Sequence, residues 1–184
     1  MRQFFASILE VLEIIAVAVV AVFLVRNFLV QPFLVSGGSM YPNFENGDYL
    51  LVDELTYRFR LPERGEVVVF KYPSDPSTYF VKRIIGLPGE RIVMKDGEVT
   101  VFNEGHPQGF VLDEVYLPKG TTTSGSGVYD LKSNEYLMLG DNRPFSFDSR
   151  SWGPLPQPDI VGLVRLRLWP LNEITAFAAP RYPN

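Results

Sequence analysis

The sequence predicts an all-β domain that follows one N-terminal transmembrane α-helix. Two observations carry this prediction. Every residue from 14 to 25 is apolar, whereas beyond residue 45 short runs rich in Val, Ile, Tyr and Phe alternate with Gly and Pro. No segment after the apolar stretch shows a helical period over the length of a helix. The chain of 184 residues therefore has room for one domain and an appendage.

Residues 11–30 form the predicted anchor, because only Glu13, Arg26 and Asn27 interrupt their apolar run. A helix of about 20 residues spans about 30 Å, the thickness of the hydrocarbon core of a bilayer. A buried core helix and a cleaved signal peptide are the alternatives. The run is longer than a typical signal-peptide core and no A-x-A site follows it before Gln31, which favours a retained anchor.

Apolar runs with the alternation of strands make up most of the remaining chain. They cover residues 49–55, 66–72, 79–85, 91–95, 98–102, 110–116, 135–139 and 160–169. Asp96-Gly97 between two of them is typical of a two-residue hairpin turn of type I′. Residues 119–127 (KGTTTSGSG) predict a flexible loop.

Composition argues against several classes of function. A net charge of −4 with scattered Lys and Arg offers no basic surface for nucleic acid. With no cysteine and one histidine the chain lacks the ligands of a zinc site, so we predict neither a metal nor another cofactor. A Ser-His-Asp triad would need His106, which lies in a loop-like segment without a recognisable partner. We interpret His106 as an exposed loop residue.

Ser39 is the first candidate for chemistry. It follows two adjacent glycines, Gly37 and Gly38, which let the backbone adopt φ > 0 and present the hydroxyl on a tight turn. The alternative is a flexible Gly-Ser hinge between the anchor and the domain.

Lys82 is the second candidate. Strand alternation places Phe80 and Lys82 on one face, and Val81 and Arg83 on the other. One face should be buried, so one of the two cations must meet an apolar environment. Burial lowers the pKa of a lysine, whereas an arginine stays protonated, so only Lys82 could become a neutral base. An edge strand with both cations in water is the alternative.

A serine hydroxyl needs an adjacent base to act as a nucleophile. With His106 set aside, a lysine is the remaining known partner in a serine acyl-enzyme. A third polar cluster, residues 140–150 (GDNRPFSFDSR), predicts either the hydrogen-bonded wall of a site or a solvated loop with a surface pair of Asp148 and Arg150.

In this order the segments resemble bacterial type I signal peptidases over nearly the whole chain. The matching blocks are residues 38–42 (GSMYP), 64–70 (RGEVVVF), 81–89 (VKRIIGLPG) and the cluster 140–150. The resemblance implies the signal peptidase or LexA-like β fold, and the removal of signal peptides from exported preproteins after small residues (A-x-A). It also implies a short cytoplasmic segment 1–10 and a catalytic domain 31–184 outside the cytoplasmic membrane, whereas sequence physics alone leaves the side open.

The resemblance also implies a role for individual residues. Ser39 would attack the scissile carbonyl and donate its backbone N–H to the oxyanion, and Lys82 would take the hydroxyl proton. Ser146 would orient Lys82 by a hydrogen bond, and Asp148 and Arg150 would form a supporting salt bridge, with Asp141 and Asn142 in the same support. Many members have a serine where this chain has Gly37, which would leave the oxyanion to backbone donors.

The same resemblance outlines the substrate site. Small residues would be selected by shallow apolar pockets lined by Val35, Met40, Phe44, Phe80 and Val81. The extended substrate would add a strand beside residues 33–36 and the strand of Lys82. In place of the large second β-domain of some members, only a small insertion is expected around residues 102–133.

Two other functions stay open. A LexA-like self-cleaving protease shares the pairing of serine and lysine, but those proteins carry a DNA-binding helical domain where this chain has its apolar stretch. A membrane-tethered β-domain that binds a partner without catalysis would have no need of Ser39 and Lys82 together.

Overall fold

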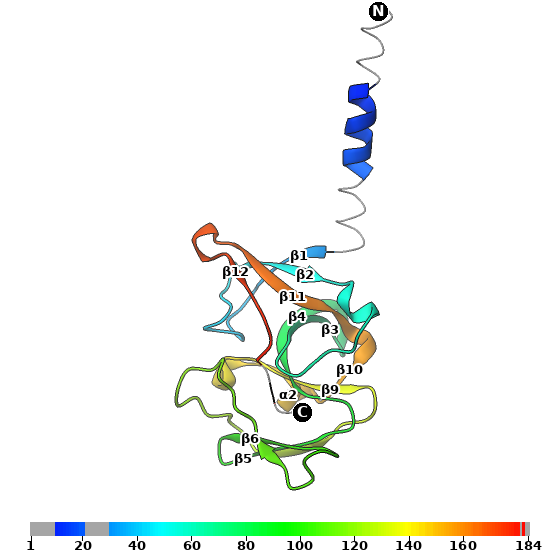
Figure 1. Ribbon diagram of the computed structural model, residues 1–184. Helices are drawn as coiled ribbons and strands as arrows, with labels where there is room; N and C mark the ends of the chain where they lie inside the picture. The colour runs from blue at the N-terminus through cyan, green and yellow to red at the C-terminus, as the bar shows by residue number, and fades with distance from the viewer. Residues whose placement is uncertain (1–9, 21–29, 181, 183–184) are drawn as a thin grey trace, which may run out of the picture.

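The computed structural model describes residues 10–20, 30–180 and 182. Residues 10–20 are helical and exposed (Figure 1). Among the described residues, no helix has both the length and the apolar content needed to cross a membrane. The predicted anchor, residues 11–30, includes positions 21–29, which lie outside the described residues, as do positions 1–9 of the predicted cytoplasmic segment.

In the described part of the chain the domain consists of two antiparallel β-sheets. The larger has the strand order β1-β2-β11-β3-β4-β9-β10, with β12 paired to β11, and the smaller has the order β7-β6-β5-β8. The strands are β1 (Val30–Leu34), β2 (Tyr49–Asp53), β3 (Val67–Tyr72), β4 (Asp75–Gly86), β5 (Arg91–Lys95), β6 (Glu98–Phe102), β7 (Phe110–Val111), β8 (Gly127–Asp130), β9 (Glu135–Leu139), β10 (Leu155–Pro156), β11 (Ile160–Trp169) and β12 (Thr175–Ala176). The predicted β-rich fold is therefore confirmed.

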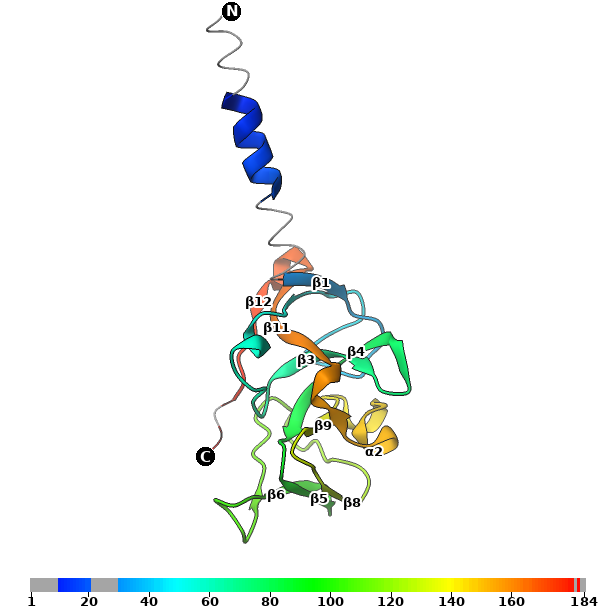
Figure 2. The same cartoon turned by 90° about the vertical axis from the view of Figure 1, so that its right-hand side faces the viewer.

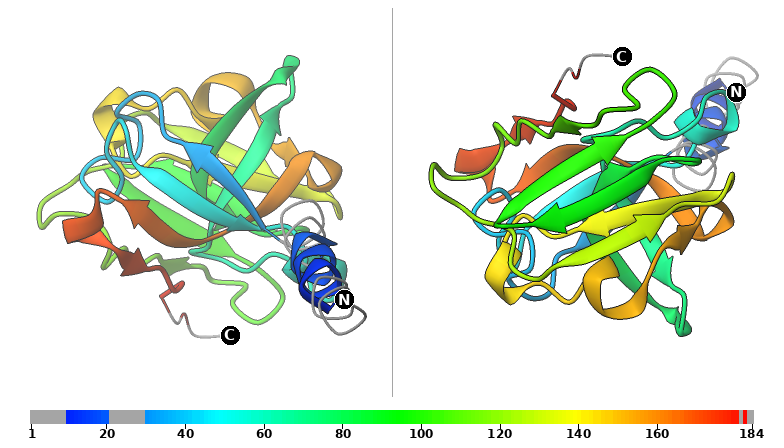
Figure 3. Two further views of the ribbon diagram at one scale, coloured as in Figure 1. Left: turned by 90° about the horizontal axis from the view of Figure 1, so that it is seen from above. Right: turned by 90° about the horizontal axis from the view of Figure 1, so that it is seen from below.

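Short helical turns connect these strands. They are α2 (Ser149–Trp152) and the 3₁₀ turns η1 (Thr56–Arg58), η2 (Arg143–Phe145), η3 (Gln157–Asp159) and η4 (Leu171–Glu173). Strand β1 and the smaller sheet lie at opposite ends of the domain in two perpendicular views (Figures 1 and 2). Figure 3 shows the strands from above and below.

Four of the predicted runs coincide with β5, β6, β9 and β11. The run predicted over 110–116 ends after Val111, because the side chains of Glu114 and Tyr116 turn toward buried arginines. Strands β1, β8, β10 and β12 were not predicted, since each is short and three of them contain or adjoin Pro or Gly. Residues 102–133 contribute β7 and β8 to the sheet that β5 and β6 begin.

Strand β3 lies at the centre of the hydrophobic core. Val67 and Val69 pack into one cluster of buried residues, and Val68 and Phe70 pack into another on the opposite face. Its neighbour β4 pairs with β3 on one side and, from Arg83 onward, with β9 on the other. This central place explains why β4 is buried on both faces from residue 82 to 86.

The hairpin between β5 and β6 has the predicted type I′ turn. Asp96 and Gly97 adopt φ angles of 54° and 87°, both in the left-handed region that this turn requires. Lys95 and Glu98 are paired on either side of the turn. The local sequence therefore sets the register of the smaller sheet.

Gly97→Ala should lower the free energy of unfolding by about 1–2 kcal/mol, because an L-residue is strained in the left-handed region. The added Cβ would also lie 3.1 Å from the side chain of Thr122. Urea denaturation followed by tryptophan fluorescence measures the change. Asp96→Asn is the matched control and should stay within about 0.5 kcal/mol of the wild type, because Asn adopts the left-handed region readily. Equal losses in both variants would contradict this account of the turn.

Candidate active site

Ser39 lies on a tight turn between β1 and β2, which we call the nucleophile turn (residues 36–42). Gly37 adopts a φ of 97°, so the predicted left-handed glycine is present in front of Ser39. The N–H of Gly37 donates to Asn46 Oδ1 at 2.9 Å, and the N–H of Tyr41 donates to the carbonyl of Gly38 at 3.2 Å. These bonds make the segment an ordered turn and not a flexible hinge.

Lys82 meets Ser39 across this turn. Its Nζ donates to Ser39 Oγ at 2.7 Å and to the carbonyl of Val81 at 2.9 Å, and 3% of the residue is exposed. Within the described residues no carboxylate lies at ion-pair distance from this amine. Burial lowers the pKa of Lys82 to about 8, although the charges of Asp148 and Asp141 act in the opposite direction. The buried amine and the hydroxyl of Ser39 are therefore within hydrogen-bonding distance of each other.

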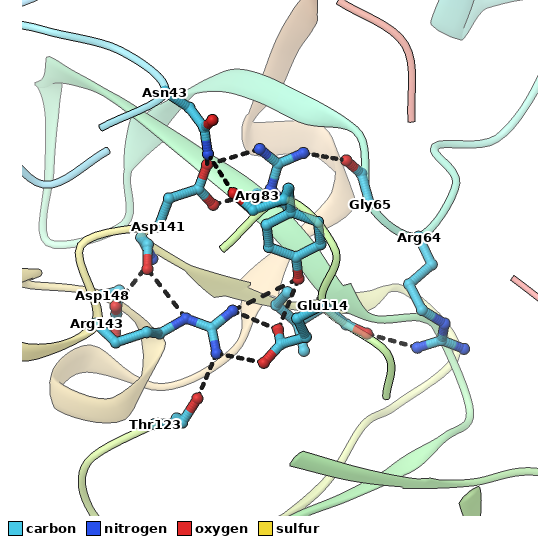
Figure 4. A network of polar contacts seen from close by, with 12 residues as sticks. Asn43, Arg64, Gly65, Arg83, Glu114, Thr123, Asp141, Arg143 and Asp148 are labelled. Atoms are coloured by element: carbon cyan, nitrogen blue, oxygen red, sulfur yellow. Dashed lines mark hydrogen bonds and ion pairs between the residues drawn. The ribbon is translucent and has the colours of Figure 1, made fainter. Parts of the chain in front are cut away.

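Arg83, the next residue of β4, is also buried, with 5% of its surface exposed. Its Nε and Nη2 donate to Asp141 at 2.8 and 2.6 Å, and its Nη1 donates to the carbonyl of Gly65 at 2.8 Å (Figure 4). We expected one buried cation on this strand, and the structure buries two because β4 is central. Arg83 is paired with a carboxylate, whereas the acceptors of Lys82 within the described residues are a hydroxyl and a carbonyl.

Residues 140–150, here called the wall segment, lie against the nucleophile turn. The N–H of Asn142 donates to the carbonyl of Ser39 at 3.0 Å, and its Nδ2 donates to the carbonyl of Gly38 at 2.8 Å. Gly140 is pressed so closely against the turn that an added Cβ would overlap the carbonyl oxygen of Ser39 and the Oγ of Ser146. The cluster is therefore the hydrogen-bonded wall of a site.

Asp148 and Arg150 form the expected salt bridge, with 2.8 Å between Asp148 Oδ2 and Arg150 Nη2. Asp148 also accepts the N–H of Gly140 at 3.0 Å and caps the start of α2. Burial alone would raise the pKa of Asp148, but the hydrogen bonds from Arg150 and Gly140 hold this pKa below its usual value. A charged Asp148 thus fixes the backbone of the wall segment.

Ser146 departs from the expectation. Its Oγ is buried without a hydrogen-bond partner among the described residues, so the expected hydrogen bond to Lys82 is not formed. The hydroxyl lies close to Gly140, beside the nucleophile turn. Lys82 is oriented instead by Ser39 and by its own strand.

A groove with a cavity of about 310 Å³ leads to Ser39 and Lys82. It is lined by residues 33–39, Leu50, Val69, residues 79–82, Phe145 and Phe147. Of the predicted pocket residues, Val35, Phe80 and Val81 line it. Met40 and Phe44 lie in the core behind it, 1% and 0% exposed, because the turn that carries them points these side chains inward.

Two exposed aromatic residues, Phe145 and Phe147, extend the groove wall and were not predicted. Phe147 packs edge-on against Phe80, with ring centroids 6.4 Å apart. Aromatic residues inside an otherwise polar cluster were the signal for them in the sequence. The polar contacts of Asn43, Glu114 and Arg143 were also missed, because nothing in the local sequence pairs residues so far apart.

His106 lies on the loop between β6 and β7 and does not line the groove. It is half-buried, contrary to the exposed position expected, and its ring packs edge-on against Phe110 with centroids 5.0 Å apart. In the part of the chain that the structure describes, no group of three or more His, Cys, Asp or Glu residues could hold a metal ion.

A match to a known protein family identifies the class of protein to which the chain belongs. The family model for signal peptidase, peptidase S26, matches residues 8–169. The chain belongs to this family of signal peptidases.

Individual relatives agree with the family. The chain is 36% identical to the probable signal peptidase I-2 of Synechocystis sp., over 76% of this chain and 63% of that protein, so it spans less than two thirds of that relative's length. It is 34% identical to signal peptidase IB of Staphylococcus aureus, over 91% of this chain and 92% of that protein. A crystal structure of a signal peptidase I from Enterococcus faecalis V583 aligns with a TM-score of 0.48 and 26% identity, covering 57% of this chain and 97% of that chain.

Lys82→Met should raise the free energy of unfolding at pH 7 by about 3 kcal/mol, because a pKa lowered from 10.5 to about 8 records the cost of burying the charged amine. The advantage should shrink as the pH rises from 8 toward 10.5, since the folded wild type then releases its proton before the unfolded chain does.

Urea denaturation at several pH values measures this difference. Lys71→Met, at an exposed position of the neighbouring strand β3, is the matched control and should change stability by less than about 0.5 kcal/mol. A Lys82→Met protein that is less stable than the wild type at pH 7 would contradict the account.

Proposed function

We propose that this chain is a membrane-bound signal peptidase I, which removes N-terminal signal peptides from exported preproteins after small residues (A-x-A). The observation that carries the proposal is the contact of 2.7 Å between Ser39 Oγ and the buried amine of Lys82, at the end of an apolar groove. Membership of the signal peptidase family and relatives named signal peptidase I support it.

The proposed reaction uses Ser39 as the nucleophile and Lys82 as the general base. Neutral Lys82 takes the proton of Ser39 Oγ as that oxygen attacks the scissile carbonyl carbon, and then gives it to the leaving amine. An acyl-enzyme ester remains on Ser39, and water attacks it with the same amine as base. With a pKa of about 8, about a tenth of the Lys82 amines are neutral at pH 7.

The oxyanion would be stabilised by the backbone N–H of Ser39, which makes no backbone hydrogen bond within the described residues. The N–H of Gly37 already donates to Asn46 at 2.9 Å, and Gly37 has no hydroxyl to offer. An oxyanion donor of this kind contributes about 2.7–4 kcal/mol to transition-state stabilisation.

Asp141, Asn142, Asp148 and Arg150 are proposed as supporting residues. Asn142 holds the carbonyls of Gly38 and Ser39, which lie on either side of the Ser39 Cα, and the salt bridge between Asp148 and Arg150 fixes the wall segment from which Asn142 projects. Asp141 pairs with the charge of Arg83, the residue that follows Lys82 on β4. Ser146, whose hydroxyl lies beside the turn, is proposed to bind Lys82 or the substrate once the groove is occupied.

The substrate would lie in the groove as an extended strand. β1 is the edge strand of the larger sheet, and residues 79–82 of β4 pair with β3 but not with β9, whose pairing begins at Arg83. Both edges face the groove and have backbone groups for an added strand. Val35, Leu50 and Val69 make the lining apolar and leave room for small side chains.

The membrane anchor over residues 11–30, with the N-terminus inside and the domain outside the cytoplasmic membrane, is part of the proposal. Residues 31–39 span at most about 30 Å, so Ser39 would lie near the membrane surface, where a preprotein's own apolar segment ends. Two alternatives are less favoured. The family match argues against a LexA-like self-cleaving protease, and the contact between Ser39 and Lys82 argues against a non-catalytic tethered domain.

Ser39→Ala, Lys82→Ala and Lys82→Arg should each abolish cleavage of a reporter preprotein at its A-x-A site, the last because a guanidinium stays protonated near neutral pH. Gel analysis of the reporter measures cleavage, and circular dichroism checks the fold. Ser74→Ala and Lys71→Arg, at exposed positions, are the matched controls and should cleave normally. Normal turnover by a Ser39 or Lys82 variant would overturn the mechanism.

The pH dependence of kcat/KM should show one ionisation near the Lys82 pKa of about 8, with activity rising as the pH rises through it. The reaction needs the neutral amine, so activity should fall about tenfold for each pH unit below 7. Initial rates at subsaturating substrate between pH 5 and 10 measure the profile. A rate that is constant from pH 6 to 9 would rule out a neutral lysine as the base.

A further inference from the structure

Arg143 is the largest of the fully buried side chains in the described part of the chain, with 1% of its surface exposed. A buried guanidinium stays protonated, so it needs a counter-ion and acceptors for its N–H groups. Its Nη1 donates to Glu114 Oε2 at 2.7 Å, its Nη2 donates to Glu114 Oε1, and its Nη1 also donates to Thr123 Oγ1 (Figure 4). Both partners belong to residues 102–133, the small insertion expected from the sequence.

Arg143 in turn holds the backbone that contacts Ser39. Its Nε donates to the carbonyl of Gly140 at 3.1 Å. Between these two residues lies Asn142, whose N–H and Nδ2 bind the carbonyls of Ser39 and Gly38. Because residues 140–143 are one short stretch of chain, a displacement of Arg143 moves the donors of Asn142 and with them the nucleophile turn.

Tyr116, a second residue of the insertion, contacts Arg83 and Asn43, which are both hydrogen-bonded to Asp141 of the wall segment. The ring of Tyr116 lies 3.9 Å from the guanidinium carbon of Arg83, and its carbonyl accepts a hydrogen bond from Asn43 Nδ2 at 2.9 Å. Asn43 also donates to Asp141 Oδ2 at 2.7 Å. No residue from 102 to 133 lines the groove. The insertion therefore supports the site without a place in substrate binding.

We propose that Glu114 is a positioning residue of the cleavage reaction, whose carboxylate holds Arg143 and thereby holds Asn142 and the turn of Ser39 in place. Glu114 is the only counter-ion of Arg143 within the described residues, and its side chain is 13% exposed. The inference rests on the proposed function and adds to it the part of the chain that sets the position of Ser39 relative to Lys82.

Glu114→Gln tests the proposal, because it keeps the shape of the side chain and removes its charge. We expect kcat for a reporter preprotein to fall about 10- to 100-fold, the effect of misplacing a reacting group by about 1 Å. KM should stay within about twofold of the wild type, because the groove lining is unchanged. Asp113→Asn, at the exposed neighbouring position, is the matched control and should leave both constants unchanged.

The assay is run on the full chain below the melting transition of every variant, as measured by circular dichroism. A Glu114→Gln protein that melts earlier but cleaves with wild-type kcat when folded would show a merely structural role and overturn the proposal. A raised KM with unchanged kcat would also overturn it, because Glu114 would then act in substrate binding.

If Glu114→Gln does not fold, Glu114→Asp is the deciding variant. It keeps the charge but is one methylene shorter, so Arg143 must shift to keep its ion pair, and kcat should fall about tenfold. Wild-type kcat in a folded Glu114→Asp protein would overturn the proposal. Failure of the wild type and of Asp113→Asn to cleave the reporter would instead contradict the proposed function, which separates the two failures.

Discussion

The rest of the structure depends on one constraint, which the proposed role of Lys82 sets. A buried amine beside Ser39 must be able to lose its proton, with no carboxylate at ion-pair distance within the described residues. Lys82 meets this constraint because β4 runs through the centre of the larger sheet, where desolvation lowers the lysine's pKa to about 8. The negative charges of Asp148 and Asp141 favour the protonated amine of Lys82, so each carboxylate needs another cation as its partner. Arg150 pairs with Asp148 and Arg83 pairs with Asp141, which leaves the amine its neutral acceptors.

The same carboxylates also build the site mechanically. Asp148 binds the N–H of Gly140 as well as Arg150, and Asp141 binds Asn43 as well as Arg83. Each of the two carboxylates therefore binds an arginine and also a second group, which belongs to the wall segment for Asp148 and to Asn43 for Asp141. The ion pairs that engage these two carboxylates are for this reason also contacts that hold the wall segment beside the nucleophile turn.

Local patterns in the sequence predicted most of the longer strands and made Ser39 and Lys82 candidates, because alternation and turn preference act over a few residues. The roles of the two residues came from the resemblance to a family. Local patterns were not sufficient for contacts between distant segments. Burial of Arg83 depends on β4 being central, and the inward direction of Met40 and Phe44 depends on a turn without strand alternation. The pairing of Glu114 with Arg143 joins positions 29 residues apart that no local rule connects.

The proposed role of Glu114 makes residues 102–133 important to a site that they do not line. Arg143 cannot give up its charge, so the wall segment is stable in its present position only where a carboxylate reaches it from outside. Residues 102–133 bring that carboxylate together with Thr123 and the ring of Tyr116, each against a buried arginine. Residues 102–133 thus form the outer half of an ionic network whose inner half is the wall segment. On this account the length of the segment can vary without loss of the site, provided that one carboxylate and its neutral partners still reach Arg143.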